Sequence, residues 1–298
     1  MNLRAKSKSF WRNTGETEVG GGLDRGAQST LSPFLKWAGG KRWFVRHHAG
    51  LFPTTYNRYF EPFLGGGAVY FHLRPQQAVL NDVNPEVIAA YQAMKDHWVG
   101  LKKSLAYHQR LHDADGNYYY TVRARTPTKL VQKASRMIYL NRTCFNGIYR
   151  VNRQGEFNVP RGSKDSVLME TDDFKSMAAL LATADLRVGD FERVIDEAME
   201  GDLVFADPPY TVRHNLNGFI KYNEVLFSWA DQERLARALK RAAARGAKVV
   251  ATNANHHSVR ALYESWDFLT RSASRFSQIS ADGASRKQFE ELIITCNI

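Results

Sequence analysis

Cysteine is scarce in this sequence: the 298 residues include only Cys144 and Cys296, which lie far apart in the chain. Two isolated thiols provide neither a disulfide framework nor the paired spacing of a zinc site. The nine histidines are scattered, and the adjacent pairs at 47–48 and 256–257 lack the i, i+4 spacing that places two imidazoles on one helix face. We therefore expect a protein without a structural disulfide and without a metal ion.

Long apolar runs are also missing. No stretch approaches the roughly 20 apolar residues that a membrane-spanning helix requires, and the N-terminal segment lacks the apolar run of a signal peptide. Residues 1–30 combine charge with three consecutive glycines and few large apolar side chains, so they cannot bury enough surface to offset the entropy cost of ordering. We expect residues 1–30 to be a disordered leader, on a cytoplasmic protein without membrane partners.

Positive charge, in contrast, is abundant. Lys and Arg together number 41 against 30 for Asp and Glu, which gives a formal net charge of +11. Such an excess favours polyanions, because contacts to phosphates release condensed counterions. Many basic proteins simply carry solvated lysines, so the charge alone leaves nucleic-acid binding open.

Short apolar segments alternate with helical patterns from residue 32 onward. Segments of strand length lie at 59–63, 78–82, 186–190, 202–206 and 247–252, with helical patterns at 68–73, 84–94 and 231–245. Two further segments near the end of the chain, 268–277 and 289–296, are typical of an antiparallel pair. This alternation predicts an α/β fold with a doubly wound, mostly parallel sheet and an antiparallel strand at its C-terminus.

About 90 residues between the second and third expected strands interrupt this alternation. The span from 96 to 181 contains three consecutive tyrosines at 118–120, many arginines and a polar segment at 141–164. An insertion of this size is expected to form a subdomain of its own. We therefore expect one domain from residues 31–95 and 182–298, and an inserted, mainly helical subdomain from residues 96–181.

A glycine turn, Phe63-Leu64-Gly65-Gly66-Gly67, separates the first expected strand from a helix. Glycines at such a turn allow positive φ and let a ligand approach the backbone closely. A dinucleotide-binding fingerprint would need another glycine where this chain has Tyr70, which disfavours NAD. Asp82 ends the next strand, where a doubly wound fold places a carboxylate on ribose hydroxyls. A turn-capping role before Asn84 is the alternative for Asp82.

The segment Asp207-Pro208-Pro209-Tyr210 follows the fourth expected strand, at the ligand-binding edge of such a sheet. Two consecutive prolines fix two φ angles and remove two N–H donors, so the carbonyls there are rigidly aimed and free to accept hydrogen bonds. A carboxylate and a prolyl carbonyl can accept from the two N–H groups of an adenine amine, while the aromatic ring stacks on the base. The segment therefore predicts a methyl-acceptor site; a Pro-Pro turn that merely ends a strand is the alternative.

Six motifs occur in a fixed order along the chain: PFLKWAGGK (33–41), FLGGG (63–67), NDVN (81–84), NRTCFNGIYR (141–150), GEFNVP (155–160) and DPPY (207–210). In this order they closely resemble the Dam-type, D12 class DNA adenine-N6 methyltransferases, over the span from about residue 32 to the C-terminus. The resemblance implies a Rossmann-like class I methyltransferase fold, S-adenosyl-L-methionine as cofactor and double-stranded DNA as partner. It also makes the insertion the target recognition domain, and the reaction requires neither a metal nor an oligomer.

The resemblance implies a cofactor site at Trp37, Lys41, Phe63, Gly65, Gly67, Asp82, Asp190, Phe191 and Asp207. Asp82 would bind the ribose, and Asp190 with Phe191 would contact the adenine of the cofactor. A simple strand-end aspartate is the alternative for Asp190. Asp207 would close the pocket near the methionine part and the target amine, as part of a catalytic group that consists of Asp207, Pro208, Pro209 and Tyr210.

The resemblance also implies DNA contacts at Lys36, Phe145, Asn146, Ile148, Arg150 and Arg161. Phe145 matches an aromatic residue that wedges into the duplex where the base is flipped. Arg150 matches an arginine that reads a guanine, for which a bidentate contact to O6 and N7 is the physical basis; a phosphate contact is the alternative. Arg161 stands where the family usually has an aromatic residue. This departure affects the contacts expected to the outer base pairs of the recognition site. The expected recognition site is GATC or a related short sequence.

Two other functions remain open. An RNA adenine-N6 methyltransferase would use the same acceptor chemistry, but the segment from Phe145 to Arg150 is typical of a protein that binds duplex DNA. A catalytically inactive DNA-binding relative would not need the intact segment from Asp207 to Tyr210. We therefore expect a site-specific DNA adenine methyltransferase, of the kind found in restriction-modification systems.

Overall fold

The structure is a computed structural model, and it describes residues 31–152, 154–211, 227–275 and 289–298. These residues belong to one compact unit, Leu31–Ile298. The expected leader at residues 1–30 lies outside the described residues. Within the described part of the chain, no helix is long and apolar enough to cross a membrane.

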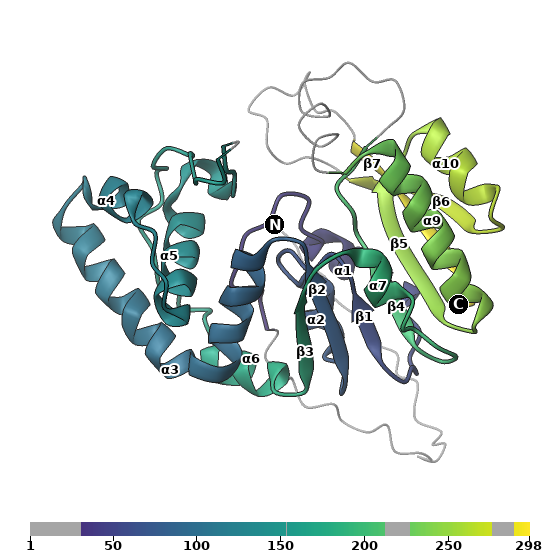
Figure 1. Cartoon of the computed structure of the whole chain (residues 1–298), viewed down its shortest axis with the longest axis horizontal. Helices are drawn as coiled ribbons and strands as arrows, with labels where there is room; N and C mark the ends of the chain where they lie inside the picture. The colour runs from purple at the N-terminus through teal and green to yellow at the C-terminus, as the bar shows by residue number, and fades with distance from the viewer. Residues whose placement is uncertain (1–30, 153, 212–226, 276–288) are drawn as a thin grey trace, which may run out of the picture. The chain divides into compact units, whose positions relative to one another are not determined.

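A seven-stranded sheet in the order β3-β2-β1-β4-β5-β7-β6 forms the centre of this unit (Figure 1). The strands are β1 (Tyr59–Glu61), β2 (Ala78–Asp82), β3 (Ala184–Val188), β4 (Leu203–Ala206), β5 (Lys248–Ala254), β6 (Leu269–Arg275) and β7 (Phe289–Cys296). The first five are parallel, and β7 pairs antiparallel with both β5 and β6. The predicted sheet, with its antiparallel C-terminal pair, is therefore confirmed.

The strand order reverses between β1 and its neighbour β4. In a doubly wound sheet, such a switch point opens a crevice at the carboxyl ends of the two strands, because the connections leave in opposite directions. The glycine turn follows β1 and the Asp207 segment follows β4. The topology therefore brings these two segments to the same edge of the sheet.

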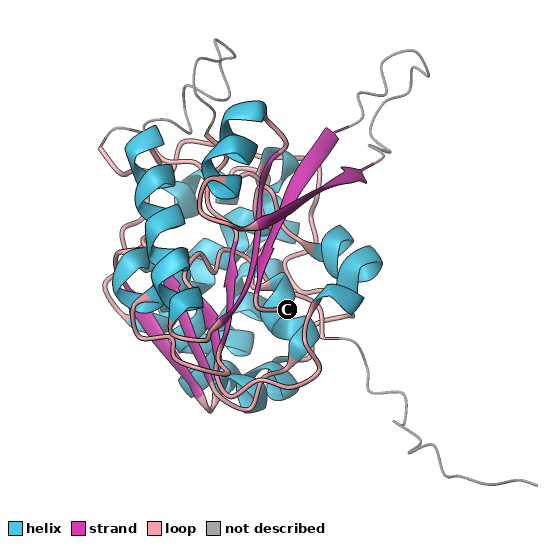
Figure 2. Ribbon diagram, turned by 90° about the vertical axis from the view of Figure 1, so that its right-hand side faces the viewer, coloured by secondary structure: helices cyan, strands magenta, loops and turns pink. Residues whose placement is uncertain are grey.

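Helices lie on both sides of the sheet (Figure 2). They are α1 (Arg42–His48), a 3₁₀ turn η1 (Ala49–Leu51), α2 (Ala68–Leu73), α3 (Pro85–Ala114), α7 (Phe191–Ile195), α9 (Trp229–Ala244) and α10 (His257–Glu264). Strand side chains alternate between two cores, as their period of two requires. Tyr59 and Phe205 pack in the core that contains α1 and α2, whereas Phe60 and Val204 pack in the core that contains α9 and α10.

Capping residues explain where two of these helices begin. Asn84 accepts a hydrogen bond from the Glu86 N–H and precedes a proline, which together start α3. Ser228 and Asp231 form a capping box, so α9 begins at Trp229, two residues before the predicted start. The short helices α1, α7 and α10 were not predicted from the sequence.

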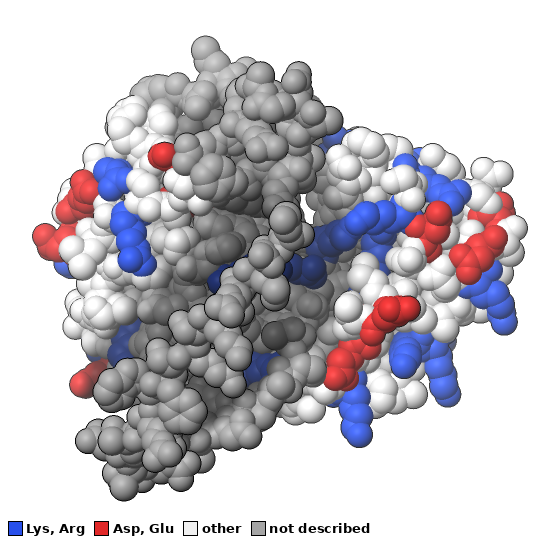
Figure 3. Space-filling view, turned by 180° about the vertical axis from the view of Figure 1, so that it is seen from behind, with Lys and Arg blue, Asp and Glu red and all other residues white. Residues whose placement is uncertain are grey.

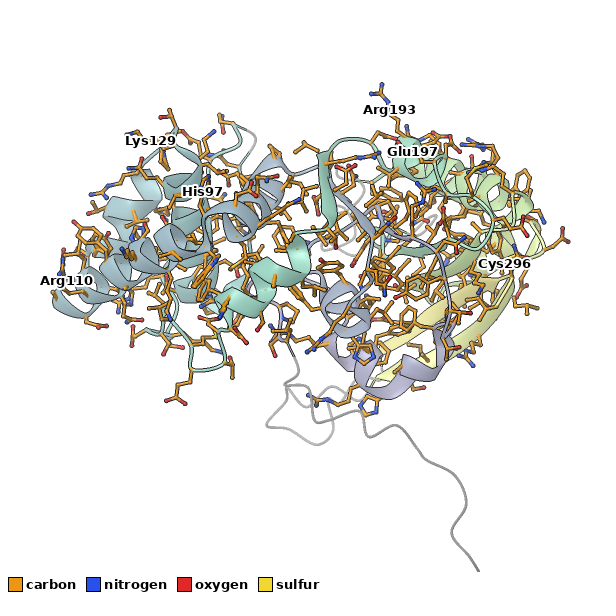
Figure 4. All side chains as sticks on the ribbon, turned by 90° about the horizontal axis from the view of Figure 1, so that it is seen from below. His97, Arg110, Lys129, Arg193, Glu197 and Cys296 are labelled. Atoms are coloured by element: carbon orange, nitrogen blue, oxygen red, sulfur yellow. The ribbon has the colours of Figure 1, made fainter. Side chains whose placement is uncertain are left out.

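Between β2 and β3 the chain forms the helices α3, α4 (Tyr118–Ala124), α5 (Leu130–Thr143) and α6 (Phe174–Leu181). The prediction that the first of these helices ends near Met94 is wrong, because α3 continues to Ala114 with a break in helical geometry at His97 (φ −137°, ψ 29°). Figure 4 shows His97 and Arg110 along this helix. Before the break α3 packs beside the sheet, and beyond it Leu101 and Leu105 are buried next to α5.

Candidate active site

The glycine turn and Asp82 form one hydrogen-bonded unit at the carboxyl ends of β1 and β2. The Asp82 carboxylate accepts from the Gly65 N–H through Oδ2 and from the Asn84 N–H through Oδ1, each at 2.9 Å. Burial raises the pKa of Asp82 above its usual range. Asp82 thus fixes both the glycine turn and the turn that leads into α3, and each carboxylate oxygen retains a lone pair for a ligand.

Trp37 lies directly over this turn. A Cβ added to Gly65, whose φ is +46°, would lie 2.5 Å from Trp37 Cδ1, so only glycine fits there. The other face of the indole stacks on Tyr149, with ring centroids 5.7 Å apart and an interplanar angle of 21°. Trp37 therefore connects the glycine turn with the segment at 141–150 that was predicted to recognise DNA.

Asp207, at the carboxyl end of β4, is held by two donors that share one of its oxygens. Lys41 Nζ lies 2.9 Å from Oδ1, and the Thr252 hydroxyl donates to the same oxygen at 2.7 Å. Lys41 is only 3% exposed, so its ammonium needs a buried anionic partner. No described residue donates to Asp207 Oδ2, so this oxygen can accept from a substrate.

A second carboxylate, Glu291, completes this cluster from β7. The Tyr210 hydroxyl donates to Glu291 Oε2 at 2.9 Å, and Lys41 Nζ lies 3.5 Å from the same oxygen. Lys41 Nζ also lies 5.0 Å from the centroid of the Tyr210 ring. Burial raises the pKa of both Glu291 and Tyr210. The ammonium of Lys41 is therefore shared between two carboxylates and held beside the ring of Tyr210.

Neither Glu291 nor Thr252 was predicted as a site residue. The one sequence signal for Glu291 is a charged residue in a strand that is otherwise largely apolar, and Glu290 beside it shares that signal. The structure separates the two, because successive side chains of a strand point to opposite faces. Glu291 is buried, whereas Glu290 is exposed and accepts a hydrogen bond from Asn255 at the surface.

An aromatic wall lies beside the glycine turn. Phe63 stacks on Phe191, with centroids 5.2 Å apart and an interplanar angle of 29°. Asp190 caps α7 by accepting from the Glu192 N–H, and it forms an ion pair of 2.6 Å with Arg234. The structure thus brings Phe63, Asp190 and Phe191 together and adds Arg234, whose guanidinium lies 4.5 Å from the centroid of the Phe191 ring.

The segment predicted to recognise DNA presents its apolar side chains to solvent. Phe145 is 54% exposed and Ile148 is 42% exposed, so both side chains are accessible to a partner. Phe145 begins the 3₁₀ turn η2 (Phe145–Gly147), in which Asn146 adopts a left-handed conformation (φ 56°). Arg150 is exposed, and its Nε donates to Asn158 Oδ1 at 3.0 Å.

Two predicted DNA contacts have partners within the protein. Arg161 donates to the Gly116 carbonyl at 3.0 Å and to Asp165 Oδ1 at 2.8 Å, so its guanidinium ties the polar segment to the end of α3. The backbone of Lys36 exchanges two hydrogen bonds of 2.8 Å with the side chain of Asn141. A DNA contact by Arg161 stays a prediction, and such a contact would compete with these internal bonds.

Glu61, at the end of β1, predicts a pH dependence of stability. It accepts from the Tyr59 hydroxyl at 2.8 Å, and burial raises its pKa to about 8 from an unperturbed 4.5. Between these values the folded state holds a proton that the unfolded state has lost, so stability falls as pH rises through this interval. We expect the free energy of unfolding to fall by about a few kcal/mol from pH 5 to pH 8.

The Glu61 contribution can be isolated by urea unfolding at a series of pH values. Glu61→Gln should flatten the fall, whereas Glu170→Gln, which changes an exposed glutamate, should leave the profile of the parent unchanged. Parallel profiles for the parent and Glu61→Gln would show that Glu61 titrates normally.

The strand order, with the glycine turn and residues 207–210 at the carboxyl ends of β1 and β4, is that of a Rossmann-like methyltransferase fold. More specifically, the chain belongs to the D12 class N6 adenine-specific DNA methyltransferases, whose family model matches residues 37–276. Enzymes of this family methylate adenine in DNA and therefore require a methyl donor and a DNA substrate. This assignment favours DNA over the RNA-directed alternative.

Methyltransferases similar to this chain match most of its length. The type II methyltransferase M1.LlaDCHI of Lactococcus lactis subsp. cremoris is 36% identical over 274 residues, which cover 89% of this chain and 95% of the relative. The type II methyltransferase M.MjaIII of Methanocaldococcus jannaschii is 31% identical, over 89% of this chain and 99% of the relative. A DNA adenine methylase of Haemophilus influenzae is 31% identical, over 70% and 74% respectively.

Proposed function

We propose that the chain transfers the methyl group of S-adenosyl-L-methionine to N6 of an adenine flipped out of double-stranded DNA. The cluster at the end of β4 carries this proposal, because Lys41 and Thr252 engage one oxygen of Asp207 and leave the other for a substrate amine. A flipped adenine can place its amine at Asp207 Oδ2 and stack on Tyr210, which compensates the few kcal/mol that unstacking costs.

The residues of this site would act mainly by positioning. S-adenosylmethionine, when bound, supplies a methyl group that its sulfonium already makes electrophilic. Asp207 Oδ2 would accept an N–H of the amine and hold the nitrogen toward the methyl group. As the N–C bond forms, the S–C bond would break, S-adenosylhomocysteine would leave, and Asp207 would take the proton that N6 loses. Lys41 would hold the Asp207 side chain in this orientation through their ion pair of 2.9 Å.

We further propose that residues 31–95 and 182–298 form the catalytic domain and residues 96–181 the target recognition domain. The break at His97 lies at this boundary. A direct test is to express the chain in cells that lack adenine methylation and to sequence their DNA for N6-methyladenine. Methylation confined to adenines in one short sequence, with GATC as the first expectation, supports the proposal, and unmodified DNA contradicts it.

The cofactor pocket in this proposal consists of Trp37, Lys41, Phe63, Gly65, Gly67, Asp82, Asp190, Phe191 and Asp207. Asp82→Ala is expected to weaken S-adenosylmethionine binding at least tenfold, because it removes the ribose acceptor and the bond that holds the Gly65 N–H. Isothermal titration calorimetry measures the affinity. Asp173→Ala is the matched control, since Asp173 caps α6 through the same kind of bond. An unchanged affinity in a folded Asp82→Ala protein would remove Asp82 from the site.

Arg150→Ala separates base reading from phosphate binding. If the guanidinium reads a guanine, its loss should cost about 1 to 3 kcal/mol of discrimination at one base pair, and near-cognate sequences should become methylated. Rates on a panel of duplexes with single base-pair changes measure this. A uniform fall on all duplexes would instead assign Arg150 to a phosphate. Arg110→Ala changes an exposed arginine of the same subdomain and serves as control.

A further inference from the structure

A pocket separate from the Asp207 cluster lies between residues 33–46 and the turn η2. Its volume is about 440 Å³, and its lining includes Lys36, Arg42, Arg46, Trp43, Asn146 and Gly147. No aspartate or glutamate lines it, and it adjoins the proposed cofactor pocket through Trp37 and Gly66. The pocket thus combines positive charge and aromatic surface at the segment predicted to recognise DNA.

The geometry of the cations gives this pocket a defined shape. Arg42 and Arg46 lie four residues apart on α1 and therefore on the same helix face. The stem of Lys36 crosses η2 so closely that a Cβ on Gly147 would lie 2.7 Å from Lys36 Cδ. Lys36 is thereby held against the turn that carries the exposed Phe145.

These cations are crowded and lack counter-ions. Burial and the nearby positive charges of Lys164 and Arg42 lower the pKa of Lys36 to about 8. Among the residues that the structure describes, no carboxylate forms an ion pair with Lys36, Arg42, Arg46 or Lys164, and Arg42 is bonded only to the Pro33 carbonyl, at 2.6 Å. In contrast, Arg142 and Arg234 both pair with aspartates. A cluster of this kind attracts an anion from outside the chain.

We propose that Arg42 and Arg46 form a binding site for a backbone phosphate of the DNA substrate, beside Lys36 and the recognition turn η2. This inference rests on the proposed function, because DNA lying on Phe145 and Ile148 would bring its backbone to the adjoining pocket. Arginine suits this role since its planar guanidinium binds phosphate oxygens in pairs. Figure 3 shows Lys and Arg side chains gathered along the middle of one face of the molecule.

The salt dependence of DNA binding provides the first test. Arg42→Gln/Arg46→Gln should reduce the slope of log affinity against log salt by about one for each lost phosphate contact, equally for cognate and non-cognate duplexes. The single variant Arg46→Gln is included in case the double variant misfolds. It should fold like the parent, because no described residue bonds to the Arg46 side chain. Arg193→Gln is the control; Arg193 is exposed on α7 and points away from the ribbon in Figure 4. An unchanged slope in both folded variants overturns the inference, and so does a shift in sequence preference.

Neutral linkages in the DNA provide the second test. The parent should bind a duplex with one methylphosphonate at the contacted position more weakly than the unmodified duplex. Arg42→Gln/Arg46→Gln should bind both duplexes equally well, because the variant has already lost this contact. If every methylphosphonate position weakens the parent and the variant equally, the pocket holds no phosphate. A parent that methylates DNA while failing these tests keeps its proposed function, whereas a parent that binds no DNA loses both.

Discussion

Asp207→Asn is expected to lower the rate of methyl transfer by about 10² to 10⁴-fold while the protein still folds and binds DNA. In the wild-type chain, Oδ1 takes the bonds from Lys41 and Thr252, and Oδ2 faces no described donor. Asparagine keeps the shape and can keep an acceptor toward Lys41. It then presents an NH₂ group where the adenine amine needs an acceptor, so two donors oppose each other.

Single-turnover transfer from labelled S-adenosylmethionine to a cognate duplex measures the chemical step, and fluorescence anisotropy measures DNA affinity. Asp196→Asn, which changes a carboxylate that pairs with Arg241 on the surface, should retain the parent rate. A rate for Asp207→Asn within about tenfold of the parent would mean that another group holds the amine.

Glu291→Gln is expected to reduce kcat by about 10 to 100-fold with a much smaller change in KM for the cofactor. Glu291 touches Tyr210 and Lys41, so it acts as a positioning residue. Gln can still accept from the Tyr210 hydroxyl, but it loses the charge that balances Lys41. Lys41 is then drawn toward Asp207 alone, which disturbs the placement of Tyr210 and Asp207 for the reacting amine.

Two comparisons distinguish this positioning role from a general loss of stability. Glu290→Gln changes the neighbouring glutamate, which bonds Asn255 at the surface, and should leave kcat unchanged. In a Lys41→Met background the effect of Glu291→Gln should shrink, because the ammonium through which Glu291 acts is gone. Equal effects of Glu290→Gln and Glu291→Gln, or strict additivity with Lys41→Met, would exclude a positioning role.

Local signals account for the elements that the sequence predicted well. Residues 68–73 and 78–82 were predicted with the limits that α2 and β2 have in the structure. Each is bounded by residues with strong backbone preferences, such as the Gly67 that opens α2 with φ 63°. The end of α3 could not be found in this way, because its apolar face changes neighbours at His97 and the helical pattern weakens there.

The sequence by itself determined the sheet, the glycine turn, the Asp207 segment and the family. Each depends on short runs of contiguous residues, whose type and spacing are visible in the sequence. Only the tertiary structure decided which side chains complete the site. Thr252 and Glu291 come from strands far along the chain, and the antiparallel register of β5 and β7 carries them to Asp207 and Tyr210. The partners of Arg161 were likewise decided by packing against α3. Contacts between residues so far apart in the sequence form because a buried charge requires a counter-ion in the folded core. No local sequence pattern specifies which residue supplies that counter-ion.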